Sequence, residues 1–315
     1  MTATTESTHA GAVWRAPLNR LEYCTLRVHD LEIALDWYTQ ALDLQIVDKH
    51  QGLALLTCGG DNQVDLALRL DERGRGQGVE SYSFGIDSPE SLEALAADLA
   101  GRGTPTERLD VGLPGLDGAL RVPSPTGVPL QIVASADRRT GVRNTGRDQG
   151  VAPVDTDHLN LLATDVKGYA QWLTDTFGFA TSDAFENPDG SWFVAWTHIT
   201  DQHHDVALLA TADPATRLHH VAFLAEDLNH MGEVADRVCS RGAERCEWGI
   251  GKHGGLGANN YLYMKDPSGN RIEVNSNMDD NPFEKPATVY PTEKFAEFAS
   301  IWNWMPPPPG FELGS

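Results

Sequence analysis

The stretch HHVAFLAEDLNHMGEVADRVCS, residues 219–240, places a short run of alternating apolar and polar residues directly before an amphipathic helix pattern. Alternation of this kind is typical of a half-buried strand, and the following pattern is typical of a helix that buries one face. The same order recurs in three other stretches, which begin at Leu21, Ser81 and Asp157. A unit that recurs four times indicates an internally duplicated protein.

Each helix pattern begins at a residue that can cap its first turn, because a short polar side chain accepts hydrogen bonds from free amides there. These residues are Asp30, Ser88, Asp165 and Asp227. Three further strand-like runs follow each helix, with Gly, Pro and Asn between them. The unit is therefore β-α-β-β-β, and the sequence predicts an α+β fold of four βαβββ modules paired into two domains.

Matching turns, SPTGVPLQIV and DPSGNRIEVN, close the second and fourth units. Aligning Gly127 with Gly269 places Gln131 opposite Glu273. The second half thus carries His158, His220 and Glu273 at repeat-equivalent positions. The first half carries Tyr23, Ser81 and Gln131 there.

Two imidazoles and one carboxylate, with other positions left open, form the ligand set that non-haem Fe(II) uses to handle O₂. His158, His220 and Glu273 are therefore the predicted metal ligands, and the second domain is the predicted site of the chemistry. His219 and His220 are neighbours on a strand, so their side chains should face opposite ways and only one can ligate. Aligning DHLNL with HHVAF puts His220 in register with His158.

Ordinary structural roles compete with these assignments. A buried carboxylate is costly unless it is paired or bound to a metal, so Glu273 could instead form a salt bridge to Arg271 or Lys265. Five histidines lack a comparable context and are interpreted as surface residues. They are His9, His29, His50, His198 and His230.

The bulk properties narrow the class of protein. The 315 residues suffice for two domains with real cores. No apolar stretch approaches membrane-spanning length and the N-terminus has no hydrophobic signal region, which predicts a soluble cytoplasmic protein. Its four cysteines form no CxxC pair, in keeping with a reducing compartment. The net charge of −21 argues against nucleic acid or an anionic membrane as a partner.

The predicted domain boundaries follow the repeats and the composition. The segments are an N-terminal extension (1–17), a first domain (18–136), a linker (137–152), a second domain (153–278) and a C-terminal tail (279–315). The tail carries Phe295, Trp302 and Trp304, which should pack onto a domain or a neighbouring subunit. Its four prolines from Pro306 indicate an extended end. A structural role is expected for the tail, with a lid over the active site as the alternative.

Two stretches, His203–Phe223 and Gly251–Ser276, resemble the type I extradiol catechol dioxygenases of the vicinal oxygen chelate superfamily. The resemblance extends over roughly Leu18 to Asn277. Lys252 stands where that family usually has Arg, and the spacer from His253 to Tyr263 is one residue longer than expected. The resemblance implies two vicinal-oxygen-chelate domains of the glyoxalase/bleomycin-resistance type. It also implies Fe(II), less often Mn(II), in the second domain, none in the first, and a homo-oligomer, often a tetramer.

The resemblance also assigns roles around the metal. It makes His204 the acid–base residue, with His203 as the competing candidate, because strand alternation lets only one of them face the metal. It places His253 beside a metal-bound substrate oxygen. The hydroxyl of Tyr263 could donate to a catecholate oxygen, with Tyr261 as the alternative. Weaker candidates for the substrate pocket are Trp196, Val206 and Asn260.

The function that these residues imply is extradiol (meta) ring cleavage. Both atoms of O₂ would enter a catechol-type substrate to give a 2-hydroxymuconic semialdehyde type of product. Two other classes remain open at this point. One is another metalloenzyme of the superfamily, such as a glyoxalase-like isomerase or an epoxide-opening resistance enzyme. The other is a non-catalytic binding module of the same fold, which would not need a complete metal triad.

Overall fold

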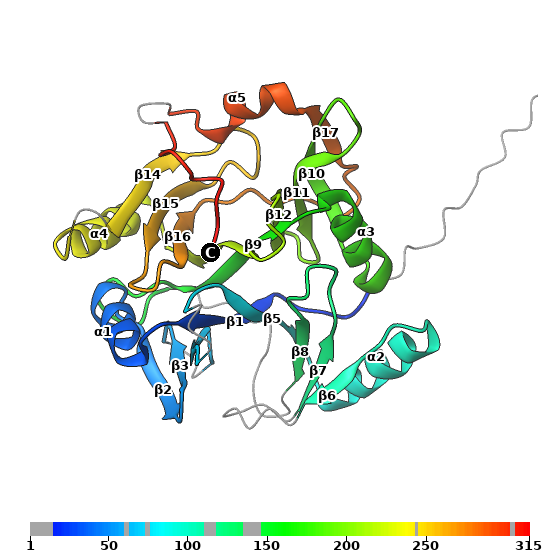
Figure 1. The fold of residues 1–315 in the computed structure, drawn as a ribbon, viewed down its shortest axis with the longest axis horizontal. Helices are drawn as coiled ribbons and strands as arrows, with labels where there is room; N and C mark the ends of the chain where they lie inside the picture. Colours follow the sequence, from blue (N-terminus) through cyan, green and yellow to red (C-terminus); the bar gives the residue numbers. More distant parts are fainter. Residues whose placement is uncertain are drawn as a thin grey trace, which may run out of the picture.

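Two mixed β-sheets with helices packed at their ends make up the computed structural model (Figure 1). It describes residues 15–59, 63–72, 76–109, 118–134, 146–242, 245–302 and 306–315. The first sheet is built from residues 21–134, with elements β1 (Leu21–Val28), α1 (Leu31–Ala41), β2 (Gln45–His50), β3 (Leu53–Thr57), β4 (Leu66–Leu70), β5 (Val79–Ile86), α2 (Pro89–Gly101), β6 (Glu107–Leu109), β7 (Gly118–Val122) and β8 (Leu130–Ala134).

The second sheet takes its strands from the remainder of the chain. Its elements are β9 (Asp155–Ala163), α3 (Val166–Phe177), β10 (Ala180–Glu186), β11 (Trp192–His198), β12 (Val206–Ala210), β13 (Leu218–Leu224), α4 (Leu228–Cys239), β14 (Cys246–Lys252), β15 (Asn260–Lys265), β16 (Arg271–Ser276), β17 (Thr288–Pro291) and α5 (Phe295–Ala299).

The two sheets have the same strand order. The first runs β2-β3-β4-β1-β5-β8-β7-β6, and the second runs β14-β15-β16-β13-β9-β12-β11-β10-β17. When the first sheet is read from β6 to β2, each of its eight strands corresponds to the strand at the same position of the second sheet, read from β14 to β10. The four predicted βαβββ modules and the α+β class are therefore confirmed. β17 of the tail is an addition, which extends the second sheet by pairing in parallel with β10.

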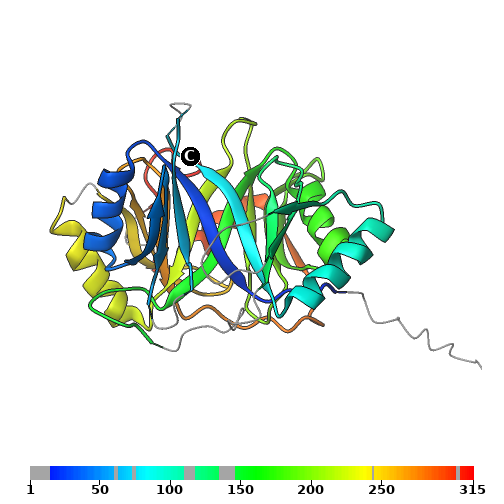
Figure 2. The same cartoon turned by 90° about the horizontal axis from the view of Figure 1, so that it is seen from below.

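The predicted capping residues begin all four module helices. The side chains of Asp30, Ser88, Asp165 and Asp227 each accept a hydrogen bond from a backbone amide in the first turn. These caps satisfy donors that a helix start otherwise leaves free. The helices gather in pairs at the two ends of the molecule, α1 beside α4 and α2 beside α3 (Figure 2).

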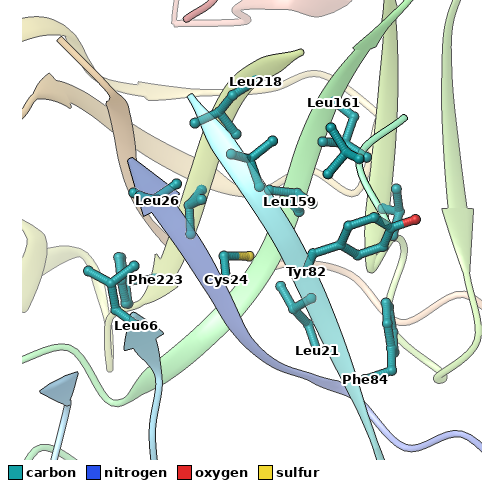
Figure 3. Packing of buried hydrophobic residues seen from close by; sticks show 14 of the residues in the cluster. Leu21, Cys24, Leu26, Leu66, Tyr82, Phe84, Leu159, Leu161, Leu218 and Phe223 are labelled. Atoms are coloured by element: carbon teal, nitrogen blue, oxygen red, sulfur yellow. The ribbon is translucent and has the colours of Figure 1, made fainter. Parts of the chain in front are cut away.

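A shared hydrophobic core joins the two halves where the central strands of both sheets face each other (Figure 3). Cys24 and Leu26 of β1 share one buried cluster with Leu159 and Leu161 of β9. Because successive strand residues point to opposite faces, this packing turns His158 and Asn160 toward the other side of the second sheet. The core thereby fixes which face of that sheet can hold a site.

Polar contacts also cross between the halves. A buried ion pair joins Arg20 Nη1, directly before β1, to Asp155 Oδ1, at the start of β9, at 2.8 Å. Burying charges is tolerated when they are paired in this way. The predicted boundaries at 1–17 and 137–152 lie largely outside the described residues, and the full set of boundaries stays a prediction.

Two histidines interpreted as surface residues are buried, so that interpretation was wrong for them. The Nδ1 atom of His198 lies 2.7 Å from the carbonyl of Thr200, and its Nε2 accepts from Asn281. His230 lies in α4, with Nε2 3.2 Å from the carbonyl of Val151. These partners are distant in sequence or supplied by turns, which strand periodicity cannot reveal. His29 and His50 are exposed as expected, and His9 lies outside the described residues.

Among the described helices, none combines the length and the apolar character needed to cross a membrane. All four cysteines are free thiols. Cys24 and Cys58 are buried, whereas Cys239 Sγ and Cys246 Sγ lie 2.7 Å apart near the surface.

Candidate metal centre and active site

Three neighbouring strands of the second sheet bring the predicted ligands together. His158 lies on β9, His220 on β13 and Glu273 on β16, and all three side chains are buried. Glu273 Oε2 lies 2.9 Å from His220 Nε2 and 3.3 Å from His158 Nε2. One ligand atom from each residue falls within 4.8 Å of the other two. Among the described residues, this group alone has three or more potential ligand atoms close enough together to hold one metal ion.

The chemistry of this donor set fits a divalent cation. Glu273 Oε2 is buried and receives no hydrogen bond of acceptable geometry, although two ring nitrogens lie beside it. The outer nitrogen of each imidazole is occupied: His158 Nδ1 lies 2.8 Å from Asp157 Oδ2, and His220 Nδ1 lies 2.7 Å from His219 Nδ1. Metal-bound histidines commonly use their second nitrogen in this way, which fixes the lone pair toward the metal.

The proton affinities point the same way. Burial lowers the pKa of His158, but the carboxylates of Asp157 and Glu273 outweigh burial and raise it to about 9. Burial lowers the pKa of His220 to about 4, although Glu273 attracts its proton. Burial alone would raise the pKa of Glu273, yet the His220 and His158 imidazoles hold it well below its usual range. A proton on His158 would balance the carboxylate, and a metal ion would displace that proton on binding.

The salt-bridge alternative for Glu273 is wrong. Arg271 donates to both oxygens of Glu247 at 2.6 and 2.9 Å, and Lys265 lies 3.1 Å from the same carboxylate. Glu273 instead accepts from the side-chain amide of Asn259 through Oε1, at 3.2 Å.

His219 does not turn away from the site as simple strand alternation predicted. A register shift between Leu218 and His220 interrupts the ladder there, so both imidazoles are buried on the same side and their ring centroids are 4.9 Å apart. His219 Nε2 lies 2.9 Å from the carbonyl oxygen of Phe311 in the tail. The alternation rule fails here because a bulge places two successive residues against one partner.

The paired histidines before β12 have a similar arrangement. His204 lines the cavity, and its ring centroid is 4.3 Å from that of His158. His203 lies behind it, with its Nδ1 atom 3.0 Å from His204 Nδ1 and its Nε2 atom 2.8 Å from Asp183 Oδ2. Burial, together with repulsion from His158, holds the pKa of His204 well below its usual range. His204 is therefore a neutral imidazole near pH 7.

His253 and Tyr263 lie next to each other near Glu273. Tyr263 on β15 pairs directly with Glu273 on β16, so the two side chains lie on the same face of the sheet. Its hydroxyl lies 3.4 Å from His253 Nε2. His253 Nδ1 lies 2.6 Å from the carbonyl of Ala299, which leaves Nε2 turned toward Tyr263. Tyr261 stacks on His253 with ring centroids 4.4 Å apart and does not line the cavity.

A cavity of about 220 Å³ opens beside the ligand set. Trp196 lines it, as predicted from the sequence. Val206 does not, because it faces the core while Ala207, its neighbour on β12, faces the cavity. Asn260 likewise lies outside the lining, where its amide donates to the carbonyl of Gly251, and the adjacent Asn259 takes its place. In both cases the residue that lines the cavity is the immediate neighbour of the predicted one. A difference of one residue matters because successive side chains of a strand point to opposite faces.

The C-terminal tail runs beside the second sheet (Figure 1) and contributes residues to the lining of this cavity. Phe295 and Ala299 of α5 line it, as do Pro307, Phe311 and Glu312. Backbone hydrogen bonds attach the tail beside the site, from Gly254 to the carbonyl of Phe298 and from Ile301 to that of Lys252. The tail therefore lies where the lid alternative would place it, and its role stays a prediction. Trp302 is partly exposed, and Trp304 lies outside the described residues.

A two-domain protein with a two-histidine, one-carboxylate centre in one domain is the class that the fold and the site define. The chain belongs to the Glyoxalase/Bleomycin resistance protein/Dioxygenase superfamily, whose sequence profile matches residues 20–113 and 156–274. Both matched segments fall within the two repeats.

Similar proteins include extradiol dioxygenases. The chain is 26% identical over 274 residues to a manganese-dependent 2,3-dihydroxybiphenyl 1,2-dioxygenase of Geobacillus genomosp. 3, covering 82% of this chain and 85% of that protein. It is 26% identical over 260 residues to a metapyrocatechase of Pseudomonas sp. (strain CF600), covering 79% and 83%. Homoprotocatechuate 2,3-dioxygenase of Brevibacterium fuscum, solved with 3,4-dihydroxyphenylacetate, superposes with a TM-score of 0.80 at 25% identity, covering 97% of this chain and 94% of that one.

Proposed function

We propose that this chain is an extradiol dioxygenase that opens a catechol-type ring and inserts both atoms of O₂. His158, His220 and Glu273 would hold Fe(II) or Mn(II). The observation that carries the proposal is the convergence of three buried ligand atoms, each within 4.8 Å of the others, beside a cavity. The relatives support the choice of reaction, and the manganese-dependent relative supports keeping both metals. When bound, the ion would lower the pKa of the catechol hydroxyls and offer open positions at which substrate and O₂ meet.

His204 is the residue we propose for proton transfer. Its Nδ1 atom is engaged by His203, so Nε2 is the nitrogen available on the cavity side. A neutral imidazole can accept a catechol proton at Nε2 and later return one to the substrate. The low pKa of His204 keeps that lone pair free near pH 7.

Asp183 and His203 would set the tautomer of His204. The Asp183 carboxylate only accepts, so it fixes the His203 proton on Nε2. His203 Nδ1 then accepts from His204 Nδ1–H, which leaves the His204 Nε2 atom unprotonated. In a hydrolase triad a carboxylate likewise orients the catalytic imidazole. Here a second imidazole, that of His203, lies between the carboxylate and the proposed catalytic imidazole of His204. His203 is thus a positioning residue rather than an alternative to His204.

His253 and Tyr263 would bind the substrate oxygens. Both line the cavity next to Glu273, and the tail carbonyl of Ala299 orients the His253 ring. Burial and the nearby Glu273 hold the pKa of Tyr263 well above its usual range, so its hydroxyl stays protonated and can donate. A donor placed where negative charge develops stabilises that charge without rearranging. His253 donates its Nδ1–H to the carbonyl of Ala299, so its Nε2 atom would accept a hydrogen bond from a substrate hydroxyl.

The test combines metal analysis with oxygen consumption. Protein reconstituted anaerobically with Fe(II) or Mn(II) is expected to bind about one ion per chain and to consume one O₂ per catechol, with a yellow ring-opened product. A protein that binds the ion but consumes no O₂ with any catechol would point to a different metalloenzyme of the superfamily. A protein that binds no ion would contradict the proposal.

A further inference from the structure

The wall of the cavity away from the metal ligands is apolar. It is formed by strands β11 and β12 on one side and by the tail on the other. A cavity of about 150 Å³ lined by aliphatic and aromatic side chains is enough for benzene, so about 220 Å³ leaves room for a substituent on a catechol ring. The apolar lining residues include Phe193, Trp196, Leu209, Trp248, Phe295 and Phe311.

No lysine or arginine lines this cavity in the part of the chain that the structure describes. Its carboxylates are Glu273, which is one of the proposed metal ligands, and Glu312, which is exposed. Arg271 lies close by but is already satisfied. It binds Glu247 through two donors and its guanidinium lies 4.4 Å from the ring centroid of Phe311, which itself faces the cavity.

The aromatic part of the wall is fixed by its own packing. The ring of Phe295 meets those of Phe193 and Phe185 edge to face, each with centroids 5.2 Å apart. Such contacts stabilise one arrangement of rings. In the described part of the chain, the wall therefore offers a substituent mainly carbon surface and no cationic side chain.

Building on the proposed function, we infer that the substrate is a catechol with an uncharged, apolar substituent, alkyl or aryl, and that carboxylated catechols are excluded. A carboxylate held against this apolar wall, away from the proposed metal, would lose its hydration without gaining a cationic side chain, which is strongly unfavourable. An apolar group would gain free energy from burial against the same wall. The inference separates this chain from its structural neighbour that was solved with 3,4-dihydroxyphenylacetate.

A pair of substrates of matched size tests the charge alone. 4-Isobutylcatechol and 3,4-dihydroxyphenylacetate have side chains of four non-hydrogen atoms and similar branching, so they differ mainly in charge. We expect the metal-loaded enzyme to favour the isobutyl compound in kcat/KM by about 100-fold or more, which is the scale of an unpaired buried charge. Equilibrium binding without O₂, followed by the fluorescence of Trp196 and Trp248 in the cavity wall, should give the same preference.

Reversing one charge at the cavity provides a matched variant. Glu312→Lys places a cation at the lining and is expected to reduce the preference at least about fivefold, as a partly exposed charge interaction would. Glu297→Lys makes the same change on an exposed face of α5 outside the lining and should leave the preference unaltered.

The outcomes separate the inference from the proposed function. A preference below about tenfold in both turnover and binding would overturn the inference while leaving ring cleavage intact. Absence of O₂ consumption with every catechol, including the unsubstituted one, would instead count against the proposed function. The binding comparison would still decide between apolar and carboxylated ligands in that case.

Discussion

The two halves of this molecule share a scaffold and differ in what fills it. Glu273 and Gln131 occupy equivalent positions in the two sheets. Glu273 pairs with Ala222 on β13, and Gln131 pairs with Ser83 at the corresponding place on β5. The second half offers three lone-pair donors that converge beside a cavity. In the first half, the hydroxyl of Tyr23 lies 3.5 Å from the amide oxygen of Gln131, and Ser83 donates to the same oxygen at 3.4 Å.

The difference extends beyond the three ligands. The ladder between β4 and β1 begins at Leu66, and the ladder between β12 and β9 begins at Val206. Two residues earlier, the second half has His204 and the first half has Val64, which lies in a hydrophobic cluster with Tyr23. Hydroxyl, amide and apolar side chains therefore occupy the place where the second half has the proposed ligands and the proposed proton-transfer group. The duplicated fold supplies the geometry, and the donor atoms decide whether it binds a metal.

The largest expected effect distinguishes Glu273 from Gln131, the residue at the equivalent position of the first half. Glu273→Ala should abolish metal retention, a greater loss than the roughly 10–100-fold that removal of a supporting residue costs. Gln131→Ala should keep about one ion per chain because it removes no ligand. Metal analysis after dialysis measures both. Full occupancy in the Glu273 variant, or loss in the Gln131 variant, would reverse the assignment of the halves.

The next effect concerns the proton-transfer position. His204→Asn should retain the metal and still bind catechol in the absence of O₂, while turnover falls by about 10²–10⁴, the usual contribution of a general acid–base group. Val64→Ala, at the equivalent place in the first half, should leave turnover unchanged. Anaerobic substrate titration followed by an oxygen pulse separates binding from the later steps. Near-parental turnover in the His204 variant would remove this residue from the mechanism.

Asp183→Asn tests the positioning chain behind His204. An amide can donate as well as accept, so it no longer forces His203 and His204 into one tautomer. Turnover should fall, with KM for catechol and metal content unchanged, and the acidic limb of the pH profile should shift. A change in metal content or thermal stability alone would show that Asp183 is only structural.

The supporting histidine should give a smaller effect. His219→Ala removes the partner of His220 Nδ1 and is expected to weaken metal affinity by about 10–100-fold without abolishing it, whereas His220→Ala should abolish binding. Competition with a chelator of known affinity measures the difference. If His219→Ala is the variant without metal, the register of β13 is shifted by one residue and His158 must be reassigned too.

Much of the site could be predicted from the sequence because the repeat supplies an internal alignment. Comparing units identified the three residues whose side chains converge, and the capping residues located the four helices. The sequence-based predictions failed where a shift of one residue decides which way a side chain points. Val206 and Asn260 each lie next to a residue that faces the cavity, and the bulge at His219 is not visible in an alternation pattern.

Contacts between distant segments were also beyond sequence reasoning. The carbonyl of Phe311 meets His219 across 92 residues, and Asp183 meets His203 from a different strand. Backbone carbonyls have no sequence signature, since every residue carries one. For the same reason, the sequence showed that the tail is aromatic, but a place over the active site was only the alternative to a structural role.

The smallest effects compare two tyrosines. Tyr263→Phe should lower turnover by about 10–100-fold, because it removes a hydrogen bond to a charged substrate oxygen. Tyr23→Phe should leave turnover and metal content unchanged and cost about 1 kcal/mol of unfolding free energy, the usual value of a neutral hydrogen bond. Steady-state kinetics and denaturant unfolding give the two quantities. Equal kinetic effects of the two changes would contradict the division of roles.

A crystal of the protein equilibrated with Mn(II) and measured at the manganese absorption edge tests the central claim most directly. One anomalous peak per chain is expected, between His158 Nε2, His220 Nε2 and the Glu273 carboxylate, with none beside Tyr23 and Gln131. A peak in the first half, or a peak that leaves these three residues without contact to the ion, would contradict the account.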